Sequence, residues 1–501
     1  MLCSPRFTQW HGLLQQTAAA VGTWPDEVRA LRDQARAETV SEAERFSADI
    51  GLPFVPWREG GPIVMTGHQP ELYHPGVWVK DFLVDRLAGE AAALGLDLVV
   101  DADTCDRVTL RVPRLGPGAG IHEIVLAEGV ATAAYVQWPV PGAAARDAFR
   151  TEGLEALSAL PAPALARHFG AFCDCLDRAA GRSTDLGMLM TAARRCYEAP
   201  AETAYLEVRA SAQCRLSSYR AFAGSLLADA PRVRDVVNAA LADYRARTGT
   251  RSAAQPFPDL AEEDGAVEAP FWLLRNGRRD AVSVRPDGTL LAGGEALCWL
   301  GATAGSAARA LVEHDLLLAP RALTLTLFQR IFVADLFVHG TGGGRYDRVT
   351  DAVIREYYGI EPPPFAIASM TLLLPLGGHI VSEEDVARAE RRLQRFEHNP
   401  DAMLAEVEFD TVAERGNAEA LARAKAEAVA AIAAPDADRK SLGAAIRAIN
   451  AELAELLEPV GRELRAALAQ VRAEREGSAV LTDRTYPYCL WDPREVADKV
   501  R

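Results

Sequence analysis

The segment IVMTGHQPELYHPG, residues 63–76, lies between a short apolar run and a helical pattern. Its first three residues form the apolar run, which predicts a β-strand, and Thr66-Gly67 predicts the turn that ends this strand. From Gly76 onward the apolar residues recur at helical spacing up to Leu94, and Gly95 is expected to end the helix. The segment is therefore expected to be the loop between a strand and the helix that follows it.

A second apolar run, residues 96–100, ends in Asp101-Ala102-Asp103. Strand, loop, helix and strand over this length predict a βαβ unit, which implies a parallel sheet. The same pattern returns later, where an apolar run from Ile331 to Val338 leads through the glycine-rich segment 339–344 into a helical stretch from Tyr346 to Tyr358. Because a strand buried on both faces has such a continuous apolar run, we predict a second strand-to-helix connection in the same sheet.

The whole pattern predicts an α/β fold with a Rossmann-like parallel sheet core, helical insertions and a long antiparallel helical hairpin. Six parts are expected along the chain: N-terminal helices (1–55), the first part of the core (56–140), a helical insertion (141–260), the second part of the core (261–382), the helical hairpin (383–476) and a C-terminal tail that packs on the core (477–501). Further strands are expected near residues 108–110, 121–125, 134–138, 271–274, 282–291 and 365–374.

The hairpin is expected from two helical stretches that the turn 434–436 separates. Pro400 and Pro459 are expected to end or kink helices. The second stretch carries apolar residues at spacings of four and three, which is the heptad seam of a coiled coil: Leu442, Ile446, Ile449, Leu453, Leu456 and Val460. This seam predicts packing within the hairpin or against a second copy, so a homodimer is an expected assembly.

Composition narrows the classes of partner. The net charge is −15, which argues against a nucleic-acid binder. No stretch approaches the roughly 20 apolar residues that span a bilayer, and the first residues do not resemble a signal peptide, so we expect a cytoplasmic protein without a membrane partner. Eight cysteines form no C-x-x-C pair, which favours free thiols over a zinc site.

The first candidate site is the loop after the first predicted strand. It should lie at the carboxyl end of the sheet, where the following helix directs amide groups toward a ligand. His68 and His74 are candidate catalytic residues that contact phosphates or protonate a leaving group. The alternative is that both histidines hold the proline-rich loop together. The candidate nucleotide-binding residues here are Thr66, Gly67, Gln69 and Lys80.

The second candidate site is the glycine-rich segment. Glycines allow close approach of the backbone to a ligand, although the segment lacks the Lys-Ser/Thr pair of a P-loop, and a turn without a ligand is the alternative. Its candidate nucleotide-binding residues are His339, Gly340, Gly342, Gly343 and Tyr346.

Two aspartates complete the candidate site. Asp101 and Asp103 are candidate catalytic residues that orient an amine or a ribose or bind Mg²⁺, and turn-forming aspartates are the alternative. The spacing of His, Cys, Asp and Glu otherwise predicts no protein metal site. Arg275, Arg278 and Arg279 flank a predicted hairpin and could meet an anion, although a solvated turn is favoured.

These motifs resemble the bacillithiol synthase family. The resemblance lies in Thr-Gly-x-Gln at 66–69, Asp-x-Asp at 101–103, the late glycine segment, the helical hairpin and Arg-x-Tyr-Pro at 484–487. It implies a Rossmann-like core, an adenine nucleotide (ATP or ADP) and dimerisation through a coiled coil. His68 stands where that family carries Gln, and the Pro-Glu-Leu-Tyr-His that follows also departs from its pattern.

The resemblance thus implies a nucleotide-binding ligase or transferase that joins an amino acid or similar small group to a metabolite. The departures from the family pattern leave two substrates open: that of bacillithiol synthesis, or another metabolite that bears an amine or an acid group. The alternative is a non-catalytic nucleotide-binding or scaffold protein that dimerises through its coiled coil.

Overall fold

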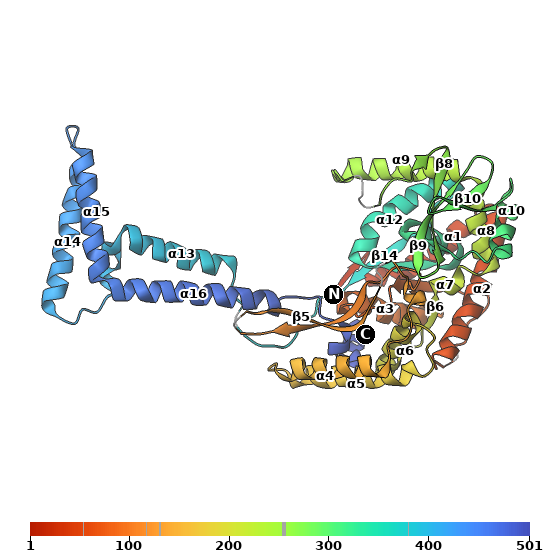
Figure 1. The fold of residues 1–501 in the computed structure, drawn as a ribbon, viewed down its shortest axis with the longest axis horizontal. Helices are drawn as coiled ribbons and strands as arrows, with labels where there is room; N and C mark the ends of the chain where they lie inside the picture. The colour runs from red at the N-terminus through yellow and green to blue at the C-terminus, as the bar shows by residue number, and fades with distance from the viewer. Residues whose placement is uncertain (54, 117, 130–131, 253–256, 379) are drawn as a thin grey trace. The chain divides into compact units, whose positions relative to one another are not determined.

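The computed structural model describes residues 1–53, 55–116, 118–129, 132–252, 257–378 and 380–501. These residues form two compact units (Figure 1). The first unit comprises residues 1–112, 123–372 and 484–501, and the second comprises residues 113–122 and 373–483. The candidate site lies in the first unit.

A six-stranded sheet organises the first unit. In spatial order its strands are β1 (Leu2–Ser4), β14 (Phe365–Ser369), β13 (Leu336–His339), β2 (Ile63–His68), β3 (Leu94–Val99) and β6 (Leu206–Arg209). All neighbours are parallel except β1, which pairs antiparallel with β14. The prediction of an α/β protein with a parallel sheet is confirmed in this mixed, mostly parallel form. Counted by chain order, the five parallel strands run 5-4-1-2-3, so the order reverses between β13 and β2.

The register aligns the ends of the central strands. Leu336 lies opposite Val64, and Ile63 lies opposite Leu94. Thr66 Oγ1 donates a hydrogen bond to the Val338 carbonyl at 2.8 Å, which ties β2 to β13 near their ends. The carboxyl ends of β2, β3 and β13 therefore share one edge of the sheet, as predicted.

Helices surround this sheet in the first unit (Figure 1). They are α1 (Trp10–Val21), α2 (Asp26–Asp49), α3 (Pro75–Ala91), α4 (Ala143–Ser158), α5 (Pro163–Ala180), α6 (Leu186–Glu198), α7 (Ala210–Gln213), α8 (Ser217–Ala228), α9 (Ala230–Thr248), α10 (Ala304–Glu313), α11 (Ala322–Phe328), α12 (Thr341–Val353) and α17 (Pro493–Val500). Helix α2 is anchored by two buried arginines, because Arg32 and Arg36 bind the Asp335 carboxylate at 2.7 and 2.8 Å. Asp335 also accepts from the Ile63 amide at 2.8 Å, which explains a charged residue inside an apolar run.

An antiparallel second sheet completes the first unit. Its strands are β7 (Glu262–Glu263), β8 (Ala266–Arg275), β9 (Arg278–Val284), β10 (Thr289–Ala292), β11 (Glu295–Trp299) and β12 (Leu318–Pro320). The segment 282–291, expected to hold strand, is divided between β9 and β10 by a turn at Pro286-Asp287-Gly288, in which the Gly288 amide donates to the Arg285 carbonyl at 2.9 Å. Residues 253–256, at the end of the expected helical insertion, lie outside the described residues.

The described residues of the predicted insertion 141–260 are mostly helical, and they also supply strand β6. Two local predictions around the first half of the sheet were wrong. The predicted strand at 134–138 is a 3-10 helix, Tyr135–Gln137. Helix α3 ends at Ala92, which takes the left-handed conformation (φ 49°), whereas Gly95 lies inside β3. A Cβ on Gly95 would come 2.9 Å from Cβ of Tyr205, so its glycine serves packing rather than helix termination.

Two predictions around β13 also need correction. The apolar run from Ile331 does not continue as one strand, because Gln329–Val333 form a π-helical turn that prolongs α11 before β13 begins. The glycine-rich segment is not a loop ahead of a helix from Tyr346. It is the first turn of α12, which begins at Thr341 with Gly340 as its N-cap.

The second unit is helical. It contains α13 (Glu383–His398), α14 (Val412–Ala431), α15 (Arg439–Leu456) and α16 (Glu458–Leu481). Helix α14 packs against α15, and α13 packs against α16 (Figure 1). Pro400 begins a short 3-10 helix, and Pro459 lies in the first turn of α16, so each predicted long helix is broken near its proline.

The predicted seam is only partly buried. Leu453 is fully buried, whereas Leu442, Ile446, Ile449 and Leu456 are half-buried. The remaining strands, β4 (Arg107–Arg114) and β5 (Gly120–Glu128), form a separate two-stranded sheet. Within the described part of the chain, no helix is both long and apolar enough to cross a bilayer.

Candidate active site

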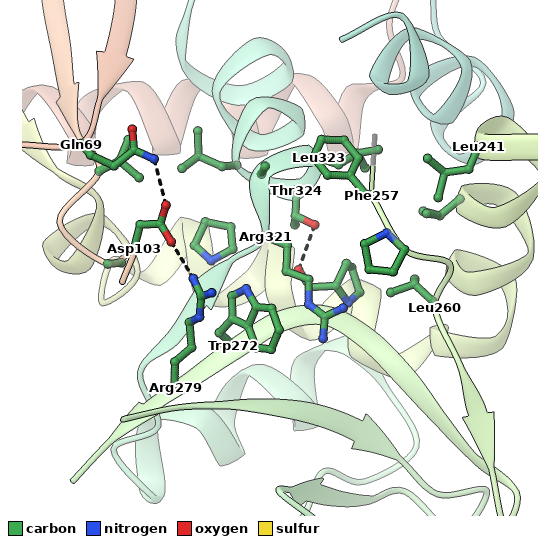
Figure 2. A pocket seen from close by; sticks show the side chains of 18 residues that line it. Gln69, Asp103, Leu241, Phe257, Leu260, Trp272, Arg279, Arg321, Leu323 and Thr324 are labelled. Carbon is green, nitrogen blue, oxygen red and sulfur yellow. Dashed lines mark hydrogen bonds and ion pairs between the residues drawn. The ribbon is translucent and has the colours of Figure 1, made fainter. Parts of the chain in front are cut away.

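A pocket of about 320 Å³ lies beside the ends of β2 and β3, against the second sheet (Figure 2). Ligands of open α/β sheets bind at the carboxyl ends of the strands, next to the point where the strand order reverses. Its wall is largely apolar and includes Val100, Val237, Leu241, Phe257, Leu260, Trp272 and Leu323. Its polar side chains are Gln69, Asp103, Arg279, Arg321 and Thr324. An apolar cavity with a few convergent polar groups is the usual form of a small-molecule site.

Asp103 is the centre of the polar group. Its carboxylate accepts from Gln69 Nε2 at 2.8 Å and from Arg279 Nη1 at 2.6 Å (Figure 2). It also accepts from the Thr104 amide at 2.9 Å. The side chain remains 35% exposed, so it can meet a ligand from the pocket.

Trp272 forms the aromatic part of the wall. The guanidinium of Arg279 lies 4.5 Å from its ring centroid and that of Arg321 lies 4.0 Å away (Figure 2). Arg321 is held in turn by Glu268 at 2.5 Å. This arrangement places two cations and a planar surface beside one carboxylate, which suits a ligand with both a ring and charged groups.

Thr66, Gly67 and Lys80 hold the strand ends together. The Lys80 ammonium donates to Thr66 Oγ1 and to the Gly67 carbonyl, both at 3.0 Å, and burial lowers its pKa. A Cβ on Gly67 would come 2.9 Å from Cβ of Leu98, so glycine allows the close approach of β2 to β3. Thr66 and Lys80 are buried below the loop and do not line the 320 Å³ pocket.

His74 is the N-cap of α3. Its Nδ1 accepts from the Gly76 amide at 3.0 Å, and its carbonyl accepts from the amides of Val77 and Trp78. Pro75 has no amide hydrogen, so these bonds occupy the amides of the first helical turn. His74 therefore holds the loop to the start of α3, which is the alternative role considered for it in the sequence.

His68 lies at the start of the same loop. Its Nδ1 is 3.2 Å from the Gln69 carbonyl and 3.8 Å from Glu71 Oε1, and its ring packs on Tyr73. Burial, reinforced by the charge of Lys80, lowers the pKa of His68 to about 3. The imidazole is thus neutral at pH 7, although its side chain remains 27% exposed.

Asp101 and Asp103 do not act together. Asp101 is fully buried and accepts from Arg209 Nε at 2.7 Å and from the Ser211 amide and hydroxyl at 2.8 and 2.5 Å. It therefore fixes β6 and α7, whereas Asp103 faces the pocket. Among the described residues, no group of three or more His, Cys, Asp or Glu side chains has the arrangement of a metal site. Each of the two carboxylates has an arginine partner, Arg209 on Asp101 and Arg279 on Asp103.

The glycine-rich first turn of α12 has a closed side and an open side. On the closed side, His339 Nε2 shares a hydrogen bond with Asp347 Oδ2 at 2.8 Å, and a Cβ on Gly343 would come 2.9 Å from His339 Nδ1. Arg330 and then His339 keep the pKa of Asp347 well below its usual range, against the effect of burial. The His339 side chain is thus held by its hydrogen bond to Asp347 of α12.

On the open side, a Cβ on Gly340 would meet no atom within 4 Å, and one on Gly342 would meet only the Tyr346 hydroxyl, at 3.9 Å. The ring of Tyr346 packs on Phe257 at 5.1 Å, and Phe257 lines the pocket. The first helical turn leaves amides without a carbonyl partner inside the helix. These amides lie at the same sheet edge as the pocket.

A buried ionic cluster behind β3 was not foreseen from the sequence. Arg194 binds Asp81, Asp97 and Glu207 at 2.8, 2.8 and 2.7 Å, and Arg195 binds Glu198 at 2.9 Å. Burial raises the pKa of Asp81 and of Glu207 well above the usual range. Burial alone would also raise the pKa of Glu198, but Arg194 and Arg195 lower it.

The structure also shows which pocket residues the sequence missed. Trp272 and Arg321 belong to no recognisable sequence motif. For Arg279, the sequence favours a solvated turn over a ligand contact. The sequence does indicate the hairpin of the second sheet. It carries no signal, however, that one face of this hairpin lies against the parallel sheet.

Neither the comparison with models of known families nor the comparison with curated proteins gave a match. The function is therefore argued from the geometry of the pocket and from the resemblance of local motifs.

Proposed function

We propose that this chain is a nucleotide-binding enzyme of the ligase or transferase type, with a Rossmann-like core, that joins a small group such as an amino acid to a metabolite. The observation that carries the proposal is the pocket beside Asp103, at the strand ends next to the reversal of strand order. The motifs shared with the bacillithiol synthase family support an adenine nucleotide, ATP or ADP, as the ligand.

Each part of the ligand has a matching surface. A planar base fits the apolar wall around Trp272 and Phe257. Asp103 follows the second parallel strand, the position from which an acidic residue binds ribose hydroxyls in related folds. Phosphates fit the open side at Gly340 and Gly342, where the amides and the dipole of α12 favour an anion. Arg279 and Arg321 add positive charge on the opposite wall.

The two histidines take different parts in this proposal. His68 is neutral at pH 7, and its lowered pKa makes it a weak proton acceptor, so its part in this proposal is to contact the ligand by a hydrogen bond and not to transfer a proton. His74 keeps the loop and α3 in place. Lys80 and Thr66 support the strand end from below.

The test is calorimetric titration of ATP and ADP into the full chain and into Gly342→Ala. A methyl group fits at this position without a clash, so the fold should be unchanged or slightly stabilised. The same methyl group stands where a phosphate would approach, and the loss of one charge-assisted hydrogen bond weakens affinity by about tenfold to a hundredfold.

Gly416→Ala is the matched control, because Gly416 is also a helical glycine with no atom near its Cβ position, in the second unit. We expect it to bind like the parent. Failure of the parent to bind either nucleotide would overturn the proposal. Catalysis is tested separately, by release of ADP, AMP or pyrophosphate in the presence of amino acids and candidate acceptors.

A further inference from the structure

A second cavity, of about 580 Å³, lies beside the turn between β9 and β10. Its wall comes from the junction of α8 and α9, the hairpin of β7 and β8, this turn, and the end of β11. It shares no residue with the pocket at Asp103. Its volume lies within the usual range of small-molecule sites.

Trp299 is the exposed aromatic residue of this wall. It is 66% exposed, whereas the other seven tryptophans of the chain are buried or half-buried. The orientation of its ring is fixed, because Nε1 donates to the Asp287 carbonyl at 2.8 Å. A Cβ on Gly288 would come 3.2 Å from the same nitrogen, so the turn packs closely against the ring. An exposed indole ring in a fixed orientation is a surface on which a planar ring can stack.

Hydrogen bonds hold the turn next to Trp299. The Gly288 amide donates to the Arg285 carbonyl, and the Arg285 amide donates to the Thr289 carbonyl, both at 2.9 Å. The Leu300 amide donates to the Gly288 carbonyl, also at 2.9 Å, which joins the turn to the end of β11. The turn and the ring are thus in place before a ligand binds, which lowers the entropic cost of binding.

Two opposite charges flank Pro286 in this turn. Arg285 and Asp287 both line the cavity, and both are exposed. The Asp287 carboxylate accepts a hydrogen bond from the Thr289 amide at 2.9 Å, but neither charged group forms an ion pair within the described part of the chain. A guanidinium donates to a carboxylate, and a carboxylate accepts from an ammonium group. The pair therefore matches a ligand that carries both of these groups.

The other charged residues of the wall are already paired. Arg234 binds Glu262, and it also binds Asp235 at 2.7 Å. The wall therefore has no surplus of either charge, which favours a ligand whose own charges cancel. Leu227 and Val267 add apolar surface.

We propose that this cavity binds a free aromatic amino acid as a zwitterion. The aromatic side chain stacks on Trp299, the α-carboxylate accepts from the Arg285 guanidinium, and the α-ammonium group donates to the Asp287 carboxylate. This inference does not rest on the nucleotide pocket, so each of the two sites is tested without the other.

The ligand class is tested by calorimetric titration of L-phenylalanine into the full chain at pH 7. Three related compounds each lack one feature of this probe. 3-Phenylpropionate lacks the ammonium group, 2-phenylethylamine lacks the carboxylate, and L-alanine lacks the ring. Each should bind about tenfold or more weakly than L-phenylalanine, because a charge-assisted hydrogen bond or the stacked ring is lost.

Two variants of the turn test the assigned charges. Asp287→Asn keeps an oxygen for the Thr289 amide but removes the charge, so it should bind L-phenylalanine no better than 3-phenylpropionate. Arg285→Gln should likewise bind L-phenylalanine no better than 2-phenylethylamine. Arg309→Gln is the matched control, because Arg309 is also exposed but does not line the cavity. It should bind L-phenylalanine like the parent.

The stacking surface is tested with two variants of Trp299. Trp299→Leu should bind L-phenylalanine about tenfold or more weakly, because the ring is lost. Trp299→Phe also loses the hydrogen bond to the Asp287 carbonyl but keeps a ring, and it should retain most of the affinity. In the parent, L-phenylalanine should protect tryptophan fluorescence from quenching by acrylamide, since Trp299 is the exposed tryptophan.

Several outcomes would overturn the proposal. They are absence of L-phenylalanine binding to the parent, equal affinity for L-phenylalanine and L-alanine, and unchanged affinity in both Asp287→Asn and Arg285→Gln. N-acetyl-L-phenylalaninamide carries the ring without either charge. If it binds as tightly as L-phenylalanine, the cavity takes a peptide segment and not a free amino acid.

Discussion

The Asp103 carboxylate accepts a hydrogen bond from the Arg279 guanidinium at 2.6 Å, and this ion pair joins the edge of the parallel sheet to the second sheet. Asp103 follows β3, whereas Arg279 lies on β9. Both side chains are partly exposed, and exposed ion pairs contribute little to folding stability. The pair is therefore better placed to meet a ligand than to stabilise the fold.

Replacing Asp103 should weaken nucleotide binding without lowering the stability of the fold. Asp103→Asn keeps the shape of the side chain but removes its charge, so we expect nucleotide affinity to fall by about tenfold or more. The melting temperature should change little, because the pair is partly exposed. Asp106→Asn, at an exposed position three residues later, should leave both unchanged. Calorimetry and thermal melts on the three proteins measure this, and equal affinity for Asp103→Asn would remove Asp103 from the site.

The histidines of the first loop should behave differently from each other. His74→Ala removes the N-cap of α3 and should lower the free energy of unfolding by about 1 kcal/mol, whereas His74→Asn should restore most of it, since Asn is a good N-cap. His68→Ala should lower turnover while the denaturation curve changes less. Urea denaturation and activity assays separate the two effects. A stable His74→Ala would show that the cap contributes little.

Substitution of two glycines at the start of α12 should change the free energy of unfolding in opposite directions. A Cβ on Gly344 would overlap the Ile367 side chain, so Gly344→Ala should cost about 1–3 kcal/mol of stability. Gly342→Ala meets no such obstacle and should gain a few tenths to about 1 kcal/mol. The difference is measured by urea unfolding of both variants. Equal stability would mean that α12 can move away from β14 without cost.

The Asp347 carboxylate predicts a dependence of stability on acid pH. The folded pKa of Asp347 is lowered, so the unfolded chain binds a proton more readily than the folded chain. Its contribution is present above its ordinary pKa of about 3.9 and is lost as the pH falls below that value. The urea midpoint of the parent should therefore fall more steeply than that of Asp347→Asn between about pH 5 and pH 2. Parallel curves would contradict this assignment.

The helical second unit makes the expected homodimer testable. The half-burial of Leu442, Ile446 and Ile449 leaves apolar surface along α15 that a second copy could cover. Light scattering should report the mass of two chains for the parent and of one chain for Ile446→Glu. Ala448→Glu is the control, because Ala448 is exposed on the same helix and should keep the mass of the parent. A parent of single-chain mass would exclude the dimer.

The main sheet could be predicted where its strands are buried on both faces. Strands β2 and β13 begin as apolar runs and lead into polar loops, and β3 is apolar apart from Gly95 and the buried Asp97. This pattern placed the ends of the three strands on one edge. Strand β6 could not be found in this way, because it has only four residues and its buried Glu207 pairs with Arg194 and Arg195 from a separate helix. Strand β1 has only three residues, and its partner β14 follows much later in the chain.

The sequence predicts where the candidate site lies in the fold better than it predicts which residues line the pocket. Glycines 342–344 suggest a loop because glycine is a poor helix former. In the helix, however, Gly343 and Gly344 pack against His339 and Ile367, which leaves no room for a side chain at these two positions. Gln69 and Asp103 line the pocket, whereas Thr66, Lys80, Asp101 and His339 are buried behind it. Trp272 and Arg321 come from the second sheet and its following helix, and no sequence signal brings them to Asp103.

The pairing of β1 with β14 has a consequence for the order of events on the ribosome. Residues 2–4 are synthesised some 360 residues before their partner strand, Phe365–Ser369. At about 5–20 residues per second, this delay is roughly 20 to 70 seconds. During most of its synthesis the growing chain therefore has an incomplete main sheet, in which the residues of β1 still lack their partner strand. The main sheet is completed only after the helices between β3 and β6 and the whole second sheet have been made.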